Sequence, residues 1–199
     1  ALSEARSKAA IKLEKAIEKE LAPLKMENTR FRVSIEAQGD SNWSEWGTDS
    51  IRFESATNVA KGDKNIAFVA LNKIASGGEL SRFMLAMKVA LSSVRSTPTI
   101  IFDEIDTGTG GAVAAAIGER LAMLGANSQV LVVTHLPQVA ARGTQHLLVK
   151  KQEKAKRVVT QVEDLSLPQR EEELARMLAG ATITQEARKA AQKLLEQAA

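Results

Sequence analysis

Thr99–Glu104 reads TIIFDE, an apolar run that ends in two adjacent carboxylates. A short run of β-branched and aromatic residues that follows Pro98 is typical of a buried strand. Gln129–His135 reads QVLVVTH, a second apolar run that ends in a histidine. Between the two runs, a glycine-rich break leads into an alanine-rich helical stretch at 112–124. Apolar strands separated by a helix predict a βαβ unit, with a parallel sheet that is covered on both faces.

The segments before this unit also show clear periodicity. Residues 1 to about 24 place apolar side chains at steps of three or four, which predicts one amphipathic helix. This pattern fits the end of a longer helix and a surface helix of the domain equally well. Alternating apolar residues predict strands at 31–36 and 51–54, and we expect these to form an antiparallel pair. Residues 58–65 have no period and are expected to form a loop. An apolar stripe from 80 to 94 predicts the helix that precedes the first buried strand.

The C-terminal part is expected to add strands and then helices. Gly180 is a residue typical of a helix C-cap, and Thr184 one typical of an N-cap. The predicted elements are strands at 146–149 and 158–162 and helices at 171–178 and 185–197.

Composition excludes several classes of protein. The 199 residues are 44% hydrophobic and 26% charged, which fits a globular domain and not a disordered chain or a fibre. The absence of cysteine excludes disulfides, a thiolate zinc site and a cysteine nucleophile. A net charge of +3 is too balanced to indicate a nucleic-acid partner by itself. No apolar run is long enough to span a bilayer, so we expect a cytoplasmic protein without a membrane partner.

Ser76-Gly77-Gly78 is the first candidate binding motif. Immediately before a helix, it would present backbone N–H groups and a hydroxyl at the positive end of the helix dipole, which suits a phosphate oxygen. The alternative is an ordinary glycine-rich turn whose serine caps the helix, and for an isolated motif the alternative is favoured.

Asp103 and Glu104 are the second candidate motif. Ligands of open α/β sheets collect beyond the carboxyl ends of the strands, where one carboxylate can hold Mg²⁺ and the other can polarise a water. The alternative is the solvated start of a loop. His135 also ends a strand and could reach a γ-phosphate, although a lone histidine is more often structural.

Taken together, these motifs resemble those of ABC-type ATPases in the form found in SMC heads. Ser76–Arg82 is similar to their signature motif, and Ile100–Glu104 to their Walker B strand. Ile105–Gly108 falls where their D-loop lies, and His135 where their switch histidine lies.

Among SMC-like proteins, the sequence resembles most specifically the RecN family, bacterial proteins of DNA double-strand-break repair. The resemblance covers roughly residues 28–199. The stretches that carry it are Lys73–Ala75 leading into the signature, Phe102–Gly108, Val133–Ala140 and Glu173–Gly180.

The main departure of the sequence from these ATPases is that it contains no G-x-x-x-x-G-K-[ST] phosphate-binding loop. Val59–Leu71 is also a poorer match than its neighbours. In the family this P-loop lies near the N-terminus, before a long antiparallel coiled coil. The resemblance therefore implies an α/β fold with a largely parallel sheet flanked by helices, the C-terminal lobe of a split head, at residues 28–199. Residues 1–27 are expected to be the end of the coiled-coil arm.

The resemblance also implies roles for individual residues, with ATP and Mg²⁺ as cofactors. Asp103 would help hold Mg²⁺, and Glu104 and His135 would be catalytic, as general base and γ-phosphate contact. Asp106 would help couple the two nucleotide sites of a dimer. The nucleotide-binding residues of the signature would be Ser76, Gly77, Gly78 and Glu79, facing the ATP of an opposing head.

The implied partners are the missing N-terminal P-loop lobe, a second head in a homodimer, and DNA ends. The protein would be cytoplasmic and associated with the nucleoid, and ATP-driven head closure would tether broken DNA. Without its P-loop this chain is expected to be inactive on its own.

The sequence leaves two alternatives to the ATPase function open. The chain could be a non-enzymatic DNA-tethering or dimerisation module, in which a basic cluster meets the phosphate backbone. That cluster comprises Lys150, Lys151, Lys154, Lys156 and Arg157. A hydrolase triad of Ser76, His135 and Asp103 is a poorer alternative, because Ser76 lacks the G-x-S-x-G elbow.

Overall fold

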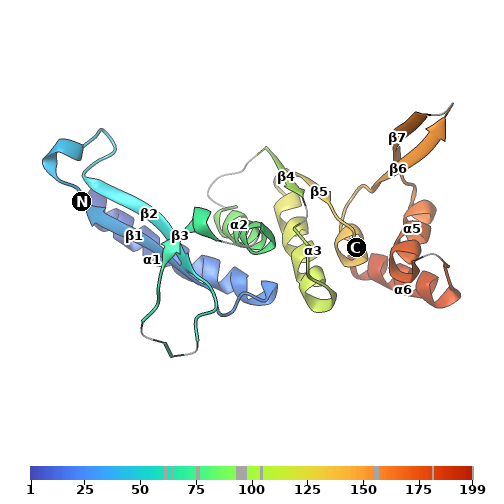
Figure 1. The fold of residues 1–199 in the computed structure, drawn as a ribbon, viewed down its shortest axis with the longest axis horizontal. Coiled ribbons are helices and arrows are strands. Elements are labelled where there is room, and N and C mark those ends of the chain that lie inside the picture. The colour runs from blue at the N-terminus through green and yellow to red at the C-terminus, as the bar shows by residue number, and fades with distance from the viewer. Residues whose placement is uncertain are drawn as a thin grey trace.

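The chain is arranged as an elongated row of three parts in the computed structural model (Figure 1). The structure describes residues 1–60, 62–63, 65–74, 77–92, 98–103, 105–154, 157–180 and 182–198. The N-terminal helix and the first sheet lie at one end, a parallel strand pair with its helices lies in the middle, and a hairpin with two helices lies at the other end. No helix in these ranges is long and apolar enough to cross a bilayer.

The first part joins a long helix to an antiparallel sheet, as the periodicity predicts. Helix α1 (Leu2–Leu21) continues into a 3₁₀ turn (Ala22–Leu24), and strands β1 (Arg30–Ala37) and β2 (Asp49–Ala56) pair over their full lengths. The short strand β3 (Val69–Ala70), which the sequence analysis missed, extends the sheet beside β2. The predicted loop at 58–65 contains no helix or strand at its described positions.

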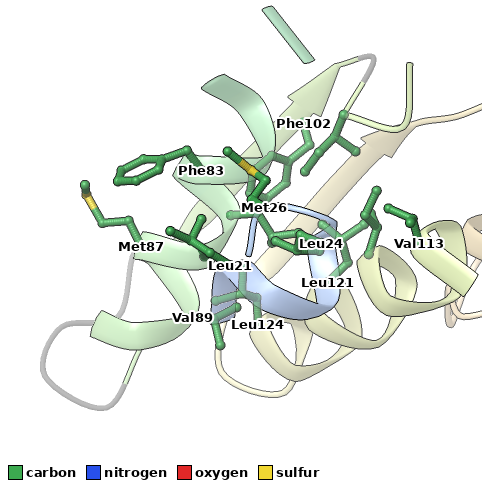
Figure 2. Packing of buried hydrophobic residues seen from close by; sticks show 14 of the residues in the cluster. Leu21, Leu24, Met26, Phe83, Met87, Val89, Phe102, Val113, Leu121 and Leu124 are labelled. Atoms are coloured by element: carbon green, nitrogen blue, oxygen red, sulfur yellow. The ribbon is translucent and has the colours of Figure 1, made fainter. Parts of the chain in front are cut away.

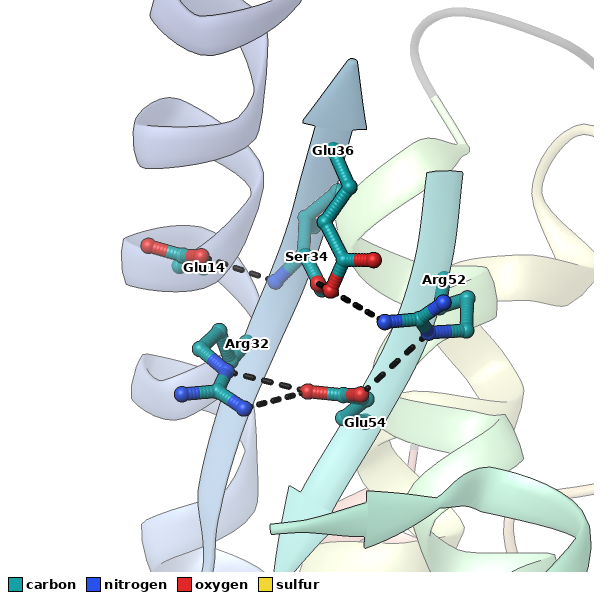
Figure 3. Close-up of polar contacts among 7 residues, drawn as sticks. Glu14, Arg32, Ser34, Glu36, Arg52 and Glu54 are labelled. Atoms are coloured by element: carbon teal, nitrogen blue, oxygen red, sulfur yellow. Dashed lines mark hydrogen bonds and ion pairs between the residues drawn. The ribbon is translucent and has the colours of Figure 1, made fainter. Parts of the chain in front are cut away.

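Charged side chains cover one face of this sheet (Figure 3). Arg32 donates two hydrogen bonds to Glu54 across the strand pair, at 3.0 and 2.5 Å, and lowers the pKa of that carboxyl. Arg52 pairs with Glu36 and contacts Glu54. At the edge of the sheet, Glu14 of α1 accepts a 2.8 Å hydrogen bond from the backbone N–H of β1, which attaches the helix to the strand.

The middle part contains the main hydrophobic core. Helix α2 (Gly77–Leu91) packs against α1, and helix α3 (Gly111–Gly125) packs against α2 and the 3₁₀ turn that follows α1. Leu21 of α1 and Leu24 of the 3₁₀ turn lie in the same cluster as Phe83 of α2 (Figure 2). Phe83 and Ile117 are fully buried. Helix α2 begins three residues before the predicted start, and its predicted end at residue 94 lies outside the described residues.

Strands β4 (Thr99–Asp103) and β5 (Gln129–Val133) form the parallel pair that the apolar runs predict. The helices cover one face of the pair, where Phe102 is only 7% exposed. The opposite face, which we call the open sheet face, consists of Ile101, Leu131 and Val133, and these are 68%, 43% and 61% exposed. The prediction that both faces are covered is therefore wrong for the described part of the chain.

The third part forms a hairpin and a helical pair. Strands β6 (Leu147–Lys154) and β7 (Arg157–Asp164) are antiparallel, so among the described strands only β4 and β5 run parallel. Helices α5 (Leu167–Ala179) and α6 (Gln185–Ala198) pack together with α4 (Pro137–Ala140), a short helix that the sequence analysis missed. Helix α5 begins four residues before its predicted start, because Ser166 forms a capping box with Gln169. The predicted caps Gly180 and Thr184 are both present.

Candidate functional site

Two of the predicted site residues lie at the same edge of the parallel sheet. Asp103 is the last residue of β4, and its register partner is Val133, the last residue of β5. His135 follows two residues later, with a side chain that is 70% exposed. Because parallel strands point their carboxyl ends the same way, this edge places a carboxylate and an imidazole beside a common space. Asp103 shares the side of the sheet on which Ile101 and Val133 are exposed.

The start of α2 reaches the same region through the turn at 105–108. A Cβ atom on Gly78 would lie 3.3 Å from the backbone oxygen of Thr107, so glycine permits this close approach. Gly77, Gly78 and Glu79 form the first turn of α2, at the positive end of the helix dipole. Such a helix start favours an anionic ligand. Ser76, predicted to contribute a hydroxyl here, lies outside the described residues.

Asp106 is buried below this edge and joins the turn to the end of β5. Its side chain is fully buried, and Oδ2 accepts a hydrogen bond from the Thr134 hydroxyl. Its Oδ1 lies 3.8 Å from Nδ1 of His135. The carbonyl oxygen of Asp106 also accepts two hydrogen bonds from Thr109. The turn is therefore fixed through both its backbone and its carboxylate.

A groove of about 320 Å³ runs along β4 beside α2. Among the described strands, β4 pairs only with β5, so its other edge, beside this groove, has no strand partner there. The groove ends at Asp103. Its lining residues are Leu80, Ser81, Met84, Lys88, Ile100, Ile101, Phe102 and Asp103.

The carboxylates at this edge suit Mg²⁺, which also binds water and phosphate, better than a metal ion whose ligands all come from protein side chains. The described residues contain no group of three or more acidic or histidine side chains placed to hold a metal ion. Mg²⁺ in phosphate-transfer sites is held by one or two carboxylates together with water and substrate phosphates. The exposed Asp103 fits that donor set, while Glu104 lies outside the described residues.

The structure thus brings four predicted elements together: the start of α2, Asp103, Asp106 and His135. The carboxylate that the structure places 3.8 Å from His135 is that of Asp106, and Ser76 lies outside the described residues, so the hydrolase triad stays a prediction. Thr134 is a site residue to which the sequence analysis assigned no role. Its position directly before the histidine at a strand end was the available signal.

The basic cluster of the alternative function lies on the β6–β7 hairpin. Lys150 is paired with Glu163 at 2.7 Å, so part of its charge is neutralised. Lys151 is exposed on β6. The side chains of Lys154, Lys156 and Arg157 lie outside the described residues, and the DNA-tethering alternative stays a prediction.

Comparison with known proteins relates the whole chain to one family. The chain is 45% identical over 194 residues to the DNA repair protein RecN of Rickettsia bellii, 41% over 194 residues to that of Vibrio cholerae, and 40% over 210 residues to that of Bacillus subtilis. These matches cover 98%, 98% and 99% of this chain, but only 34%, 34% and 36% of the relatives. The chain therefore spans about a third of their length. No model of a known protein family matches it.

Solved structures share the fold. The Smc head domain of Pyrococcus yayanosii, with its coiled coil and joint, superposes with a TM-score of 0.58 at 21% identity, covering 98% of this chain and 30% of that one. The Smc head domain of Pyrococcus furiosus gives a TM-score of 0.57 at 20% identity, with 87% and 39% covered. The predicted α/β fold of an SMC-type head fragment and the resemblance to RecN are both confirmed.

Proposed function

Because this chain matches RecN over nearly its whole length and has the fold of the C-terminal part of an SMC-type ATPase head, we propose that it is one lobe of a split MgATP hydrolase. In this proposal the missing lobe supplies the P-loop, residues 28–199 supply the remaining catalytic groups, and residues 1–27 are the end of a coiled-coil arm. The complete protein uses ATP to tether DNA ends during double-strand-break repair.

The observation that carries the proposal is the open sheet face. A parallel sheet is normally covered on both faces, whereas Ile101 and Val133 are more than half exposed here. The edge of β4 that has no partner among the described strands borders the same surface and ends at Asp103. A second lobe that covers this face and extends this sheet would bring its own phosphate-binding loop to Asp103.

Each strand-end residue then has a distinct task. Asp103 holds Mg²⁺, which when bound neutralises charge on the β- and γ-phosphates. Glu104 orients and deprotonates the attacking water, and His135 contacts the γ-phosphate. Little covalent chemistry is required of the protein, because phosphoryl transfer depends on positioning and charge stabilisation. A chain without the P-loop is accordingly inactive alone.

The start of α2 serves a second nucleotide in this proposal. Ser76, Gly77, Gly78 and Glu79 face the γ-phosphate bound by an opposing head, so that two ATP molecules are enclosed in a homodimer. Asp106 lies between this segment and the strand-end residues and helps couple the two sites. The coiled-coil arms, of which α1 is the end next to the head, transmit head closure to DNA. The protein acts in the cytoplasm at the nucleoid.

ATP turnover by the full-length protein tests this function. We expect hydrolysis that falls at least ~100-fold when Mg²⁺ is removed with EDTA, since the ion contributes several kcal/mol to charge stabilisation. Linear DNA should stimulate turnover more than closed circular DNA of the same sequence and concentration. Absence of Mg²⁺-dependent turnover with either DNA would overturn the ATPase proposal, while equal stimulation by both would remove DNA ends as the partner.

A further inference from the structure

We propose that Thr134 is a positioning residue for His135, and that it acts through the buried carboxylate of Asp106. The inference rests on the proposed ATPase function, because it concerns the imidazole that contacts the γ-phosphate. It assigns a role to a residue that touches neither nucleotide nor metal in that function.

The two oxygens of Asp106 are used differently. Oδ2 accepts a hydrogen bond from the Thr134 hydroxyl. Oδ1 is buried and has no hydrogen-bond partner among the described residues, yet it is the oxygen that lies 3.8 Å from Nδ1 of His135. A fully buried carboxylate oxygen without a partner is costly, so this atom favours an N–H donor on the imidazole. When both ring nitrogens carry hydrogen, Nδ1 can face Asp106 while Nε2 donates to a phosphate oxygen.

The Thr134 hydroxyl both donates and accepts a hydrogen bond. Its hydrogen is donated to Oδ2 of Asp106. Its oxygen accepts a 3.0 Å hydrogen bond from the backbone N–H of Leu136. The residues on both sides of His135 are therefore tied to one hydroxyl, and this sets the backbone from which the imidazole projects.

The same contacts connect His135 to the start of α2. Asp106 belongs to the turn whose neighbouring residue, Thr107, presents its carbonyl oxygen to Gly78. Thr109 holds the carbonyl of Asp106 with backbone and hydroxyl hydrogen bonds of 3.1 and 2.7 Å. A continuous set of contacts thus runs from the start of α2 through this turn to the Thr134 hydroxyl, within a single lobe.

Steady-state kinetics of the full-length protein test the inference. In Thr134→Val the shape of the side chain is retained and the hydroxyl is lost, and we expect kcat for MgATP to fall about 10-fold or more with KM changed less than 2-fold. That is the scale of a hydrogen bond to a charged group. Thr134→Ser should restore turnover to within about 3-fold of the wild type. Thr57→Val removes the hydroxyl of an exposed threonine beyond β2 and should match the wild type.

The outcomes separate this inference from the ATPase proposal. If the wild type itself does not hydrolyse ATP, the proposed function fails. If the wild type is active and Thr134→Val retains its kcat, or Thr134→Ser does not recover, the positioning role of Thr134 is contradicted.

Nitrogen-15 NMR of the imidazole rings gives a readout independent of turnover. The 199-residue chain has two histidines, His135 and His146, so only two rings contribute signals. Burial and the nearby Arg170 guanidinium lower the pKa of His146, which helps to distinguish it. We expect Thr134→Val and Asp106→Asn to shift the ring signals of His135 and to leave those of His146 in place. Unchanged His135 signals in both variants, or equal shifts of both rings, would overturn the inference.

Discussion

Replacing Glu104 with glutamine in the full-length protein is expected to lower kcat for MgATP hydrolysis by about 10²–10⁴-fold, the usual contribution of a general base. Glutamine has nearly the same shape but cannot accept the proton of the attacking water. Asp103, which precedes it at the end of β4, keeps its carboxylate, so affinity for MgATP should change less than about 3-fold.

Single-turnover hydrolysis and equilibrium binding of a fluorescent ATP analogue measure the two quantities separately. Glu196→Gln, at an exposed position of α6, is a matched control that should behave as the wild type in both assays. Turnover that survives Glu104→Gln would remove Glu104 as the catalytic carboxylate. Loss of binding together with turnover would instead give it a role in holding the nucleotide.

Introducing aspartate at both Ile101 and Val133 is expected to prevent association with the P-loop lobe, weakening it by at least ~100-fold. The proposal buries these side chains between the lobes, and an isolated carboxylate buried at such a contact costs several kcal/mol. Because both positions are more than half exposed in this chain, the fold of the chain itself should be retained.

Co-purification of the two lobes and titration calorimetry measure the association, and circular dichroism with thermal unfolding checks the fold. Ile51→Asp is the control, because Ile51 is also an exposed apolar residue, at 44%, but lies on the separate β1–β2–β3 sheet. Undiminished association of the double variant would show that the P-loop lobe does not cover the open sheet face.

Local pattern was sufficient to predict most helices and strands. Alternation of Phe31, Val33 and Ile35 predicted β1. The cap residues marked helix boundaries: Gly180 the end of α5 and Thr184 the start of α6. The elements that were missed, β3 and α4, are only two and four residues long. Segments of that length contain about one period and no repeat of it, so their structure depends on the neighbours that they contact.

The coverage of the parallel sheet could not be predicted from composition. An apolar strand has the same sequence whether its second face is covered by its own chain or by another lobe. Val133 and Phe102 are both apolar residues of a parallel strand pair, yet one is 61% exposed and the other 7%. Only the three-dimensional arrangement separates the two cases.

The site was predicted in part. Motif order indicated that Asp103 and His135 would lie at one edge of the sheet, and the register of β4 and β5 places their strand ends together. The burial of Asp106 and its contact with Thr134 were not predictable, because they depend on how the turn at 105–108 folds back under the end of β5.

The most direct test of the split-head proposal is ATP hydrolysis by this chain, alone and together with the co-expressed P-loop lobe of the same protein. We expect no turnover above background from either lobe alone, and Mg²⁺-dependent turnover from the pair that Glu104→Gln abolishes. Appreciable hydrolysis by this chain alone would contradict the account, and so would a stable complex of both lobes that stays inactive with DNA present.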